Sequence, residues 1–307
     1  MGEHDPIHVL FHPDRGKLSG AAATVPATSS SPPPLMDAVS LDAPTKAPLR
    51  LLLLCSDGPQ HSYLRYRLDQ AFPGYHCVQE TGDGQVQQLW QKGRVVDACW
   101  QAYHGWRRRL FGHDRQRRAH FDALVPGDHV LPPPDLVVDS VNCAAVWEAA
   151  ERWQPQLTIV SGTKFIGKKM FARGSLMLNL HTGHLPEYKG NHCIFFALYD
   201  GATDKIAATL HQLTSSLDGG DVLDRVYPAV LPSDDEEALY TRCLEIAINR
   251  CVDYIGRFAS GKRLDFVPQV TDGRTFRHCD RTPGKELALW WKLNMGGLLW
   301  ATGKKEI

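Results

Sequence analysis

The sequence has 307 residues, 43% of them hydrophobic and 22% charged, so it can form one large globular domain or two small ones. Lys plus Arg and Asp plus Glu both number 34, and this balance argues against a general binder of nucleic acid or of an acidic membrane. No apolar run approaches the ~18 residues of a membrane span, and no signal-peptide pattern stands near residue 1. We therefore predict a cytoplasmic protein with no membrane partner.

The eight cysteines are scattered, and none forms a CxxC pair. Several lie inside apolar runs, such as Cys55 in LLLLCSDG. Buried, unpaired thiols of this kind indicate a reducing compartment rather than the disulfide framework of a small secreted domain.

Composition divides the chain into three parts. Residues 13–48 are rich in Ala, Ser, Thr and Pro, so 1–48 is predicted to be a flexible N-terminal extension, in which 7–13 could form a short strand. Ordered structure is expected over the main domain, 49–261. The remainder, 262–307, is predicted to be a short C-terminal extension that ends in the helix-like ELALWWKLNMGGLLW.

Strand and helix patterns alternate through the main domain. Apolar or alternating runs predict strands, and amphipathic segments predict helices. The strand patterns lie at 49–59, 132–142, 155–163, 175–181 and 205–215, with a further segment at 221–232, and the helix patterns at 63–72, 86–122, 144–153 and 233–261. In the last helix Ser233 is the expected N-cap and Gly261 the terminator. This order predicts an α/β fold with an open, mostly parallel, Rossmann-like sheet, whose sites form at the carboxyl ends of strands.

One predicted strand carries two polar residues near its end. Asn179 and His181 stand two apart in LNLH, so they face the same side. An amide and an imidazole N–H could converge on one developing oxyanion. Farther along, His211 lies on another predicted strand, and the LDGGD loop offers Asp218 and Asp221. Each residue alone is as well explained by structure, for example as a turn-forming Asp, but together they predict a polar site.

These segments resemble a known family. NLHTGHLPEYKG (179–190) is similar to the N-x-H-x-S/G-x-L-P-x-Y/W-x-G signature of the formyltransferases that use 10-formyltetrahydrofolate. TLH and LDGG resemble the T-x-H strand and the L-D-x-G loop of that family, and LTIVSGTKFIGKKMF (157–171) resembles the segment that lines its folate pocket. The resemblance spans residues 49–260 and implies a formyltransferase-type sheet with 10-formyltetrahydrofolate as cosubstrate.

The resemblance also implies roles for individual residues. Asn179 and a protonated His181 would stabilise the tetrahedral oxyanion, while Asp218 would keep His181 protonated and help to remove the proton of the attacking amine. No metal is required by this chemistry. The residues expected at the cosubstrate are Thr163, Phe165, Ile166, Gly167, His211 and Asp221.

The acceptor is less well defined. The resemblance implies an amine on a small molecule, such as an amino-sugar nucleotide or a hydroxyornithine-type metabolite, because CSDGPQHSYL lacks the Gly-rich loop of the purine-pathway members. Hydrolysis of formyltetrahydrofolate is the alternative. Transfer to tRNA is disfavoured, because the 46 residues after Gly261 are too few for the β-barrel of the tRNA-directed members. A non-catalytic binding module would not need Asn179, His181 and Asp218 together.

Two further segments have no fixed role. The stretch 103–121 has six Arg and one Asp, and we interpret it first as a solvated helix face and second as a site for a phosphorylated acceptor. Its aromatic residues Trp106, Phe111 and Phe121 are then the predicted buried face. The Trp290-Trp291 pair is predicted to be core or a dimer surface, which leaves a homodimer open, and 273–287 could shape the acceptor site.

Overall fold

The computed structural model describes residues 48–301, apart from 83, 172–174 and 271–272. The predicted N-terminal extension, including the segment 7–13, lies outside the described residues except at its last position. Lys46–Ile307 form one compact unit, which is the part of the chain described below.

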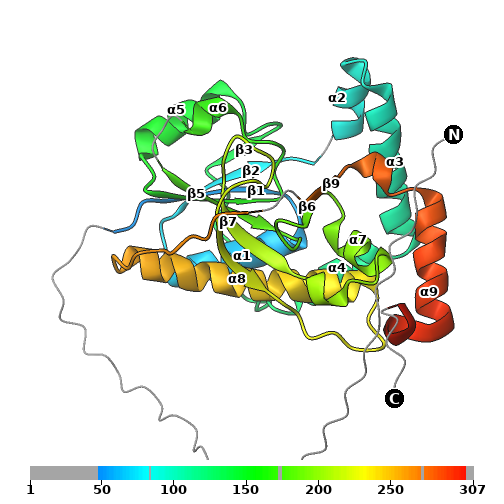
Figure 1. Cartoon of the computed structure of the whole chain (residues 1–307). Helices are drawn as coiled ribbons and strands as arrows, with labels where there is room; N and C mark the ends of the chain where they lie inside the picture. The colour runs from blue at the N-terminus through cyan, green and yellow to red at the C-terminus, as the bar shows by residue number, and fades with distance from the viewer. Residues whose placement is uncertain (1–47, 83, 172–174, 271–272, 302–307) are drawn as a thin grey trace, which may run out of the picture. The chain divides into compact units, whose positions relative to one another are not determined.

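A seven-stranded sheet forms the centre of this unit (Figure 1). Its strand order is β3-β2-β1-β4-β5-β7-β8. The strands are β1 (Leu51–Ser56), β2 (His76–Glu80), β3 (Leu136–Val138), β4 (Leu157–Ser161), β5 (Leu176–His181), β7 (Ala208–Gln212) and β8 (Val222–Val226). The first five in spatial order run parallel, β7 runs antiparallel to β5, and β8 at the edge runs antiparallel to β7. The predicted open, mostly parallel α/β sheet is confirmed.

Helices cover both faces of the sheet (Figure 1). One face holds α1 (Pro59–Ala71), α4 (His113–Asp122) and α8 (Glu236–Ala259), and the other holds α5 (Ala144–Trp153) and α6 (Lys168–Phe171). The alternation within β1 explains this arrangement, because Leu51 and Leu53 pack with α1 and α8 while Leu52 and Leu54 pack with α5 and α6. All four leucines are fully buried, as expected for a central strand covered on both sides.

The remaining elements lie beside the sheet. They are α2 (Gln85–Gln91), α3 (Val95–Leu110), β6 (Tyr188–Gly190), α7 (Cys193–Tyr199), η1 (Thr203–Lys205), β9 (Arg274–Phe276), η2 (His278–Asp280) and α9 (Pro283–Ala301). Strands β6 and β9 form a small parallel sheet, which joins the segment after residue 261 to the loop that follows β5. No strand was predicted at 188–190. Strand β6 could not be recognised locally, because its pairing partner β9 lies more than 80 residues away in sequence.

Several local expectations were wrong. Asp235, not Ser233, caps α8, and its side chain accepts a hydrogen bond from the Ala238 amide at 2.7 Å. Trp106 and Phe111 are 59% and 47% exposed, and of the three aromatic side chains predicted to be buried only Phe121 is. The predicted core role of the Trp290-Trp291 pair fails as well, since both side chains are about half exposed.

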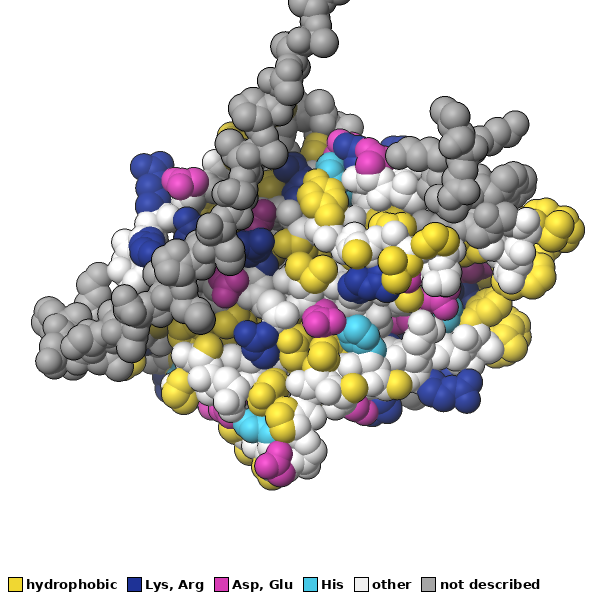
Figure 2. All heavy atoms as spheres, turned by 90° about the horizontal axis from the view of Figure 1, so that it is seen from below, with side chains coloured by type: hydrophobic (Ala, Val, Ile, Leu, Met, Phe, Trp, Pro, Cys, Tyr) yellow, Lys and Arg dark blue, Asp and Glu magenta, His cyan; other side chains and the backbone are white. Residues whose placement is uncertain are grey.

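Surface features agree with the balanced composition. On the face in Figure 2, Lys and Arg side chains are interspersed with Asp and Glu rather than gathered into a field of one sign. Among the described helices, none combines the length and the apolar character needed to cross a membrane. All eight cysteines lie in the described part of the chain and are unpaired there.

Candidate active site

A cavity of about 600 Å³ opens at the carboxyl ends of β1, β2, β4 and β5. This is the edge of an open α/β sheet at which ligand sites usually form. Asn179, His181 and Asp218 line one wall, and the predicted cosubstrate residues on the cavity are Thr163, Phe165 and Ile166. The other walls include Glu80, Gln85, Gln101, Arg108 and His278.

Asn179 is oriented by the strand next to it. In the antiparallel pair of β5 and β7, Asn179 lies opposite His211, and its Nδ2 is 3.0 Å from His211 Nε2. His211 Nδ1 donates to the Gln212 carbonyl at 3.0 Å, so Nε2 is left as an acceptor for the amide of Asn179. Burial, with a smaller effect of the His181 charge, lowers the pKa of His211 to about 4, so this ring is neutral at pH 7. One hydrogen of the Asn179 amide is thereby fixed, and the second remains for the cavity.

His181 is held by the loop that follows β5. Its Nε2 donates to the Tyr188 carbonyl at 3.1 Å, and its Nδ1 lies 3.7 Å from Asp218 Oδ2. Gly183 is required beside it, because a Cβ at this position would lie 2.4 Å from His181 Nε2. The nitrogen that can gain or lose a proton during a reaction is therefore Nδ1, which faces the carboxylate.

Asp218 sits on a tightly held turn. Its φ of 48° lies in the left-handed region, which costs a residue with a side chain about 1–2 kcal/mol. Gly190 N donates to Asp218 Oδ2 at 2.8 Å, and Gln269 Nε2 donates to the carbonyls of Asp218 and Gly220 at 2.8 and 2.6 Å. Gly220 has no alternative, because a Cβ there would lie 1.8 Å from the Gln212 carbonyl oxygen. No local motif indicates that Gln269 holds this turn, because Gln269 comes from the segment after residue 261.

The loop after β4 is organised by two residues that sequence reasoning missed. Glu80, at the end of β2, accepts from the Lys164 amide at 2.7 Å. Asn142 accepts from the Gly167 amide and donates to the Phe165 carbonyl, both at 2.6 Å. The amides of Lys164 and Gly167 are thus bonded within the protein, while the Phe165 carbonyl keeps a second lone pair. Glu80 could have been found from its position, because the carboxyl ends of β2 and β4 lie at the same edge of the sheet. Strand β2 was not predicted, however, so this signal was missed.

Three of the predicted cosubstrate residues do not line the cavity. Gly167 faces Asn142, and His211 is buried behind Asn179. The Asp221 carbonyl accepts from the Gln212 amide at 2.8 Å, and its side chain does not reach the cavity wall. The structure thus gives these three residues a supporting position instead of direct contact with a ligand.

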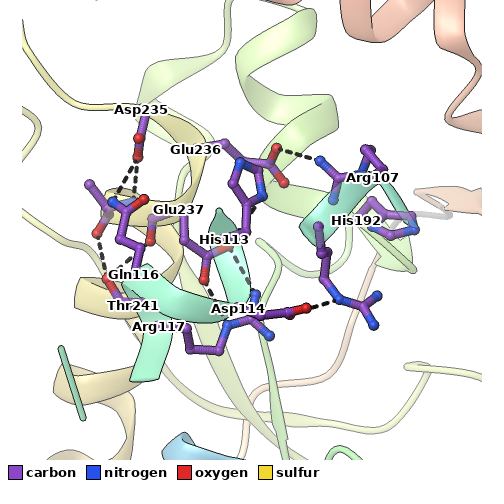
Figure 3. A network of polar contacts seen from close by, with 12 residues as sticks. Arg107, His113, Asp114, Gln116, Arg117, His192, Asp235, Glu236, Glu237 and Thr241 are labelled. Atoms are coloured by element: carbon purple, nitrogen blue, oxygen red, sulfur yellow. Dashed lines mark hydrogen bonds and ion pairs between the residues drawn. The ribbon is translucent and has the colours of Figure 1, made fainter. Parts of the chain in front are cut away.

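Part of the Arg-rich segment belongs to an internal ion network (Figure 3), whereas Arg109, Arg115 and Arg118 are exposed. Arg117 binds Glu237 with two hydrogen bonds of 2.7 and 3.0 Å, and the side chain of Arg107 is only 4% exposed. Burial raises the pKa of Glu236, but the charge and hydrogen bonds of Arg281, together with the charges of Arg107 and His113, outweigh burial and lower that pKa to about 2. The prediction of a solvated helix face is therefore wrong for Arg107 and Arg117. Arg108, by contrast, lines the cavity and keeps the second interpretation open.

Comparison with known proteins adds a family similarity. The model described as "Formyl transferase" matches residues 117–255, which include the strand with Asn179 and His181 and the turn with Asp218. This match covers less than half of the chain, and over these residues the chain is similar to formyl transferases. Curated relatives include the methionyl-tRNA formyltransferases of Listeria monocytogenes, 26% identical over 32% of this chain, and of Leptospira interrogans, 27% identical over 41%. The chain spans only 31% and 39% of the length of these relatives.

Solved structures share the fold of this chain. A Mycobacterium tuberculosis protein with a suggested sugar N-formyltransferase activity has a TM-score of 0.51 and 18% identity, over 78% of this chain and 85% of that one. The N-formyltransferase of Helicobacter canadensis has a TM-score of 0.50 and 15% identity, over 76% and 72%. At these identities the likeness concerns the fold.

Proposed function

We propose that this protein moves a formyl group from 10-formyltetrahydrofolate to an amine of a small molecule. The observation that carries the proposal is the convergence of Asn179 Nδ2, His181 Nδ1 and the Asp218 carboxylate on one wall of the cavity. Two N–H donors and a carboxylate within a few ångströms are what formyl transfer needs. The similarity to formyl transferases supports 10-formyltetrahydrofolate as the donor of the formyl group.

The residues act on defined atoms. The amine nitrogen attacks the formyl carbon, and the carbonyl oxygen becomes an oxyanion that accepts hydrogen bonds from Asn179 and His181. Each such donor is worth about 3–4 kcal/mol in acyl-transfer sites. Asp218 attracts the imidazolium of His181 and takes the proton of the attacking amine, directly or through water. The bond from the formyl carbon to N10 then breaks, and N10 takes up a proton to give tetrahydrofolate.

The far wall of the cavity supports a polar, small acceptor. Gln85, Gln101, Arg108 and His278 face the cavity, and together they offer hydrogen-bond donors and one positive charge. A phosphorylated or hydroxyl-rich amine fits this chemistry. The Helicobacter canadensis N-formyltransferase was solved with folinic acid and dTDP-3-aminofucose, so an amino-sugar nucleotide is the first acceptor to test.

The test is release of tetrahydrofolate by the purified protein from 10-formyltetrahydrofolate. Four parallel reactions contain an amino-sugar nucleotide, a hydroxyornithine-type amine, methionyl-tRNA or no acceptor. We expect turnover that depends on one of the small amines and falls at least 100-fold in Asp218→Asn. Asp253→Asn, which removes an exposed carboxylate of α8, is the control and should keep full activity.

The other results contradict the proposal in distinct ways. Formate release without acceptor would identify a hydrolase. Turnover with methionyl-tRNA alone would point to a tRNA-directed enzyme. No turnover in any reaction, or an Asp218→Asn variant as active as the wild type, would remove the assigned role of the site.

A further inference from the structure

Three histidines from distant segments meet next to the candidate active site. His104 lies on α3, His192 is the N-cap residue of α7, and His278 begins η2. One ring nitrogen from each lies within 4.8 Å of those of the other two. His278 also lines the cavity, so the cluster borders the site without sharing its catalytic residues.

His104 has an unused nitrogen. Its Nε2 donates to the His278 carbonyl at 2.8 Å, which leaves Nδ1 as a lone pair. The residue is only 1% exposed, and Nδ1 has no hydrogen-bond partner among the described residues. An unsatisfied buried polar atom costs about 1–3 kcal/mol. A ring fixed by a backbone carbonyl through one nitrogen, with the other nitrogen open, is the usual arrangement of a metal-binding histidine.

The other two rings are already at a ligand-to-ligand distance. His192 Nε2 and His278 Nδ1 are 3.1 Å apart, so one of them carries the proton that lies between them. In a tetrahedral zinc site with Zn–N of about 2.1 Å, neighbouring ligand nitrogens are roughly 3.3 Å apart. Binding would therefore require His104 to move inward by about one ångström, while the other pair keeps its spacing.

Two arginines stand close to the cluster, and carboxylates pair with both. Arg281 Nη1 lies 3.4 Å from His192 Nδ1, and Arg107 lies near the same ring. The Arg281 guanidinium makes four hydrogen bonds of 2.5–3.1 Å to Glu236 and Glu286, which also face Arg107. The two carboxylates offset part of the positive charge that a bound cation would meet. Binding would give up the long contact from Arg281 to His192.

We propose that His104, His192 and His278 bind one divalent transition metal ion of the zinc type. Imidazole nitrogens suit Zn²⁺ and its neighbours, whereas Mg²⁺ and Ca²⁺ prefer oxygen ligands. Three protein ligands leave a fourth position, which opens toward the cavity on the side of His278 and is filled by water or by an oxygen of the acceptor. The site binds α3 to the segment that carries η2, and it adds a Lewis-acidic contact for the acceptor where His278 lines the cavity.

Metal uptake by the chelator-treated full chain tests the proposal. Co²⁺ is added to the protein and followed by visible absorption, and Zn²⁺ is then used as the competitor. We expect one equivalent to bind with the strong absorption of four-coordinate Co²⁺, and affinity to fall at least 100-fold in His192→Ala and His278→Ala. The matched control is His120→Ala, which removes a histidine of α4 that pairs with Glu245 instead.

The experiment remains decisive if one variant misfolds. His278 is half-buried, so His278→Ala should keep the wild-type fold, which circular dichroism verifies. No stoichiometric uptake, or equal uptake by wild type and His278→Ala, overturns the proposal and leaves three rings joined by hydrogen bonds and water. Because the readout is binding, such a failure does not affect the proposed formyl transfer.

Discussion

The molecule contains two buried polar clusters that differ in how completely their groups are paired. Around Arg281, every guanidinium nitrogen is bonded to a carboxylate, and the side chain is fully buried against the ring of Phe195. At the end of β5, in contrast, Asn179 keeps one amide hydrogen free of protein, and His181 and Asp218 approach only to 3.7 Å. The paired cluster fixes structure, and the incompletely paired one can receive a reacting group.

This difference separates two expectations. Removing a member of the Arg281 cluster leaves buried charges without partners, so stability should suffer most. Removing a member of the β5 cluster leaves fewer buried groups without a partner, so activity should suffer more than stability.

Arg281→Ala should have the largest effect. It leaves Glu236 and Glu286 facing each other with only Arg107 between them, and we expect a loss of about 3–5 kcal/mol in the free energy of unfolding, measured with urea. Arg94→Ala, which breaks the exposed pair with Asp97, should cost less than ~1 kcal/mol. Similar losses in the two variants would mean that the buried network contributes no more than a surface ion pair.

Asn179→Ala should act on turnover. Losing one oxyanion donor is expected to lower kcat by about 10²–10³, whereas the free energy of unfolding should fall by about 1–3 kcal/mol, since the variant leaves the buried Nε2 of neutral His211 without its hydrogen-bond partner. Steady-state kinetics and urea unfolding on the same sample check both halves. If the loss in the free energy of unfolding equals the loss in activation free energy, Asn179 has a structural role like that of the Arg281 cluster.

Acid should weaken the fold through buried neutral histidines. Burial lowers the pKa of His61 and of His211 to about 4, below the ~6.5 of an unfolded chain, so between these values the unfolded state binds protons that the folded state does not. Stability is therefore complete above about pH 6.5 and falls by about 1.4 kcal/mol per pH unit for each ring as pH drops toward 4. Urea unfolding at several pH values measures this slope. His211→Asn should reduce this slope by the contribution of one ring. An unchanged slope would show that His211 is not buried as a neutral ring.

The sequence predicted what depends on local pattern. Leu51–Leu54 reads as a strand covered on both faces because every residue is apolar, and the two-residue spacing of Asn179 and His181 places both at one strand end. These patterns are confined to a few consecutive residues, so they can be recognised without knowledge of the fold.

What could not be predicted depends on partners far away in sequence. Ser233 and Asp235 are both good N-cap residues, and only the packing of α8 decides between them. Arg107 and Arg117 look like surface residues until Glu236 and Glu237 are brought next to them. Glu80 and Gln269 have no local signature at all, because their roles are contacts with loops that follow other strands.

The contacts made by residues 269–286 bear on how the chain is assembled. Gln269 clamps the Asp218 turn, β9 completes β6 beside His181, and Arg281 locks the start of α8. During synthesis, the sheet and most of its helices can form before this stretch leaves the ribosome, but the turn that carries Asp218 lacks its clamp until then. The order in which the chain emerges thus delays completion of the candidate active site until the scaffold around it is already in place.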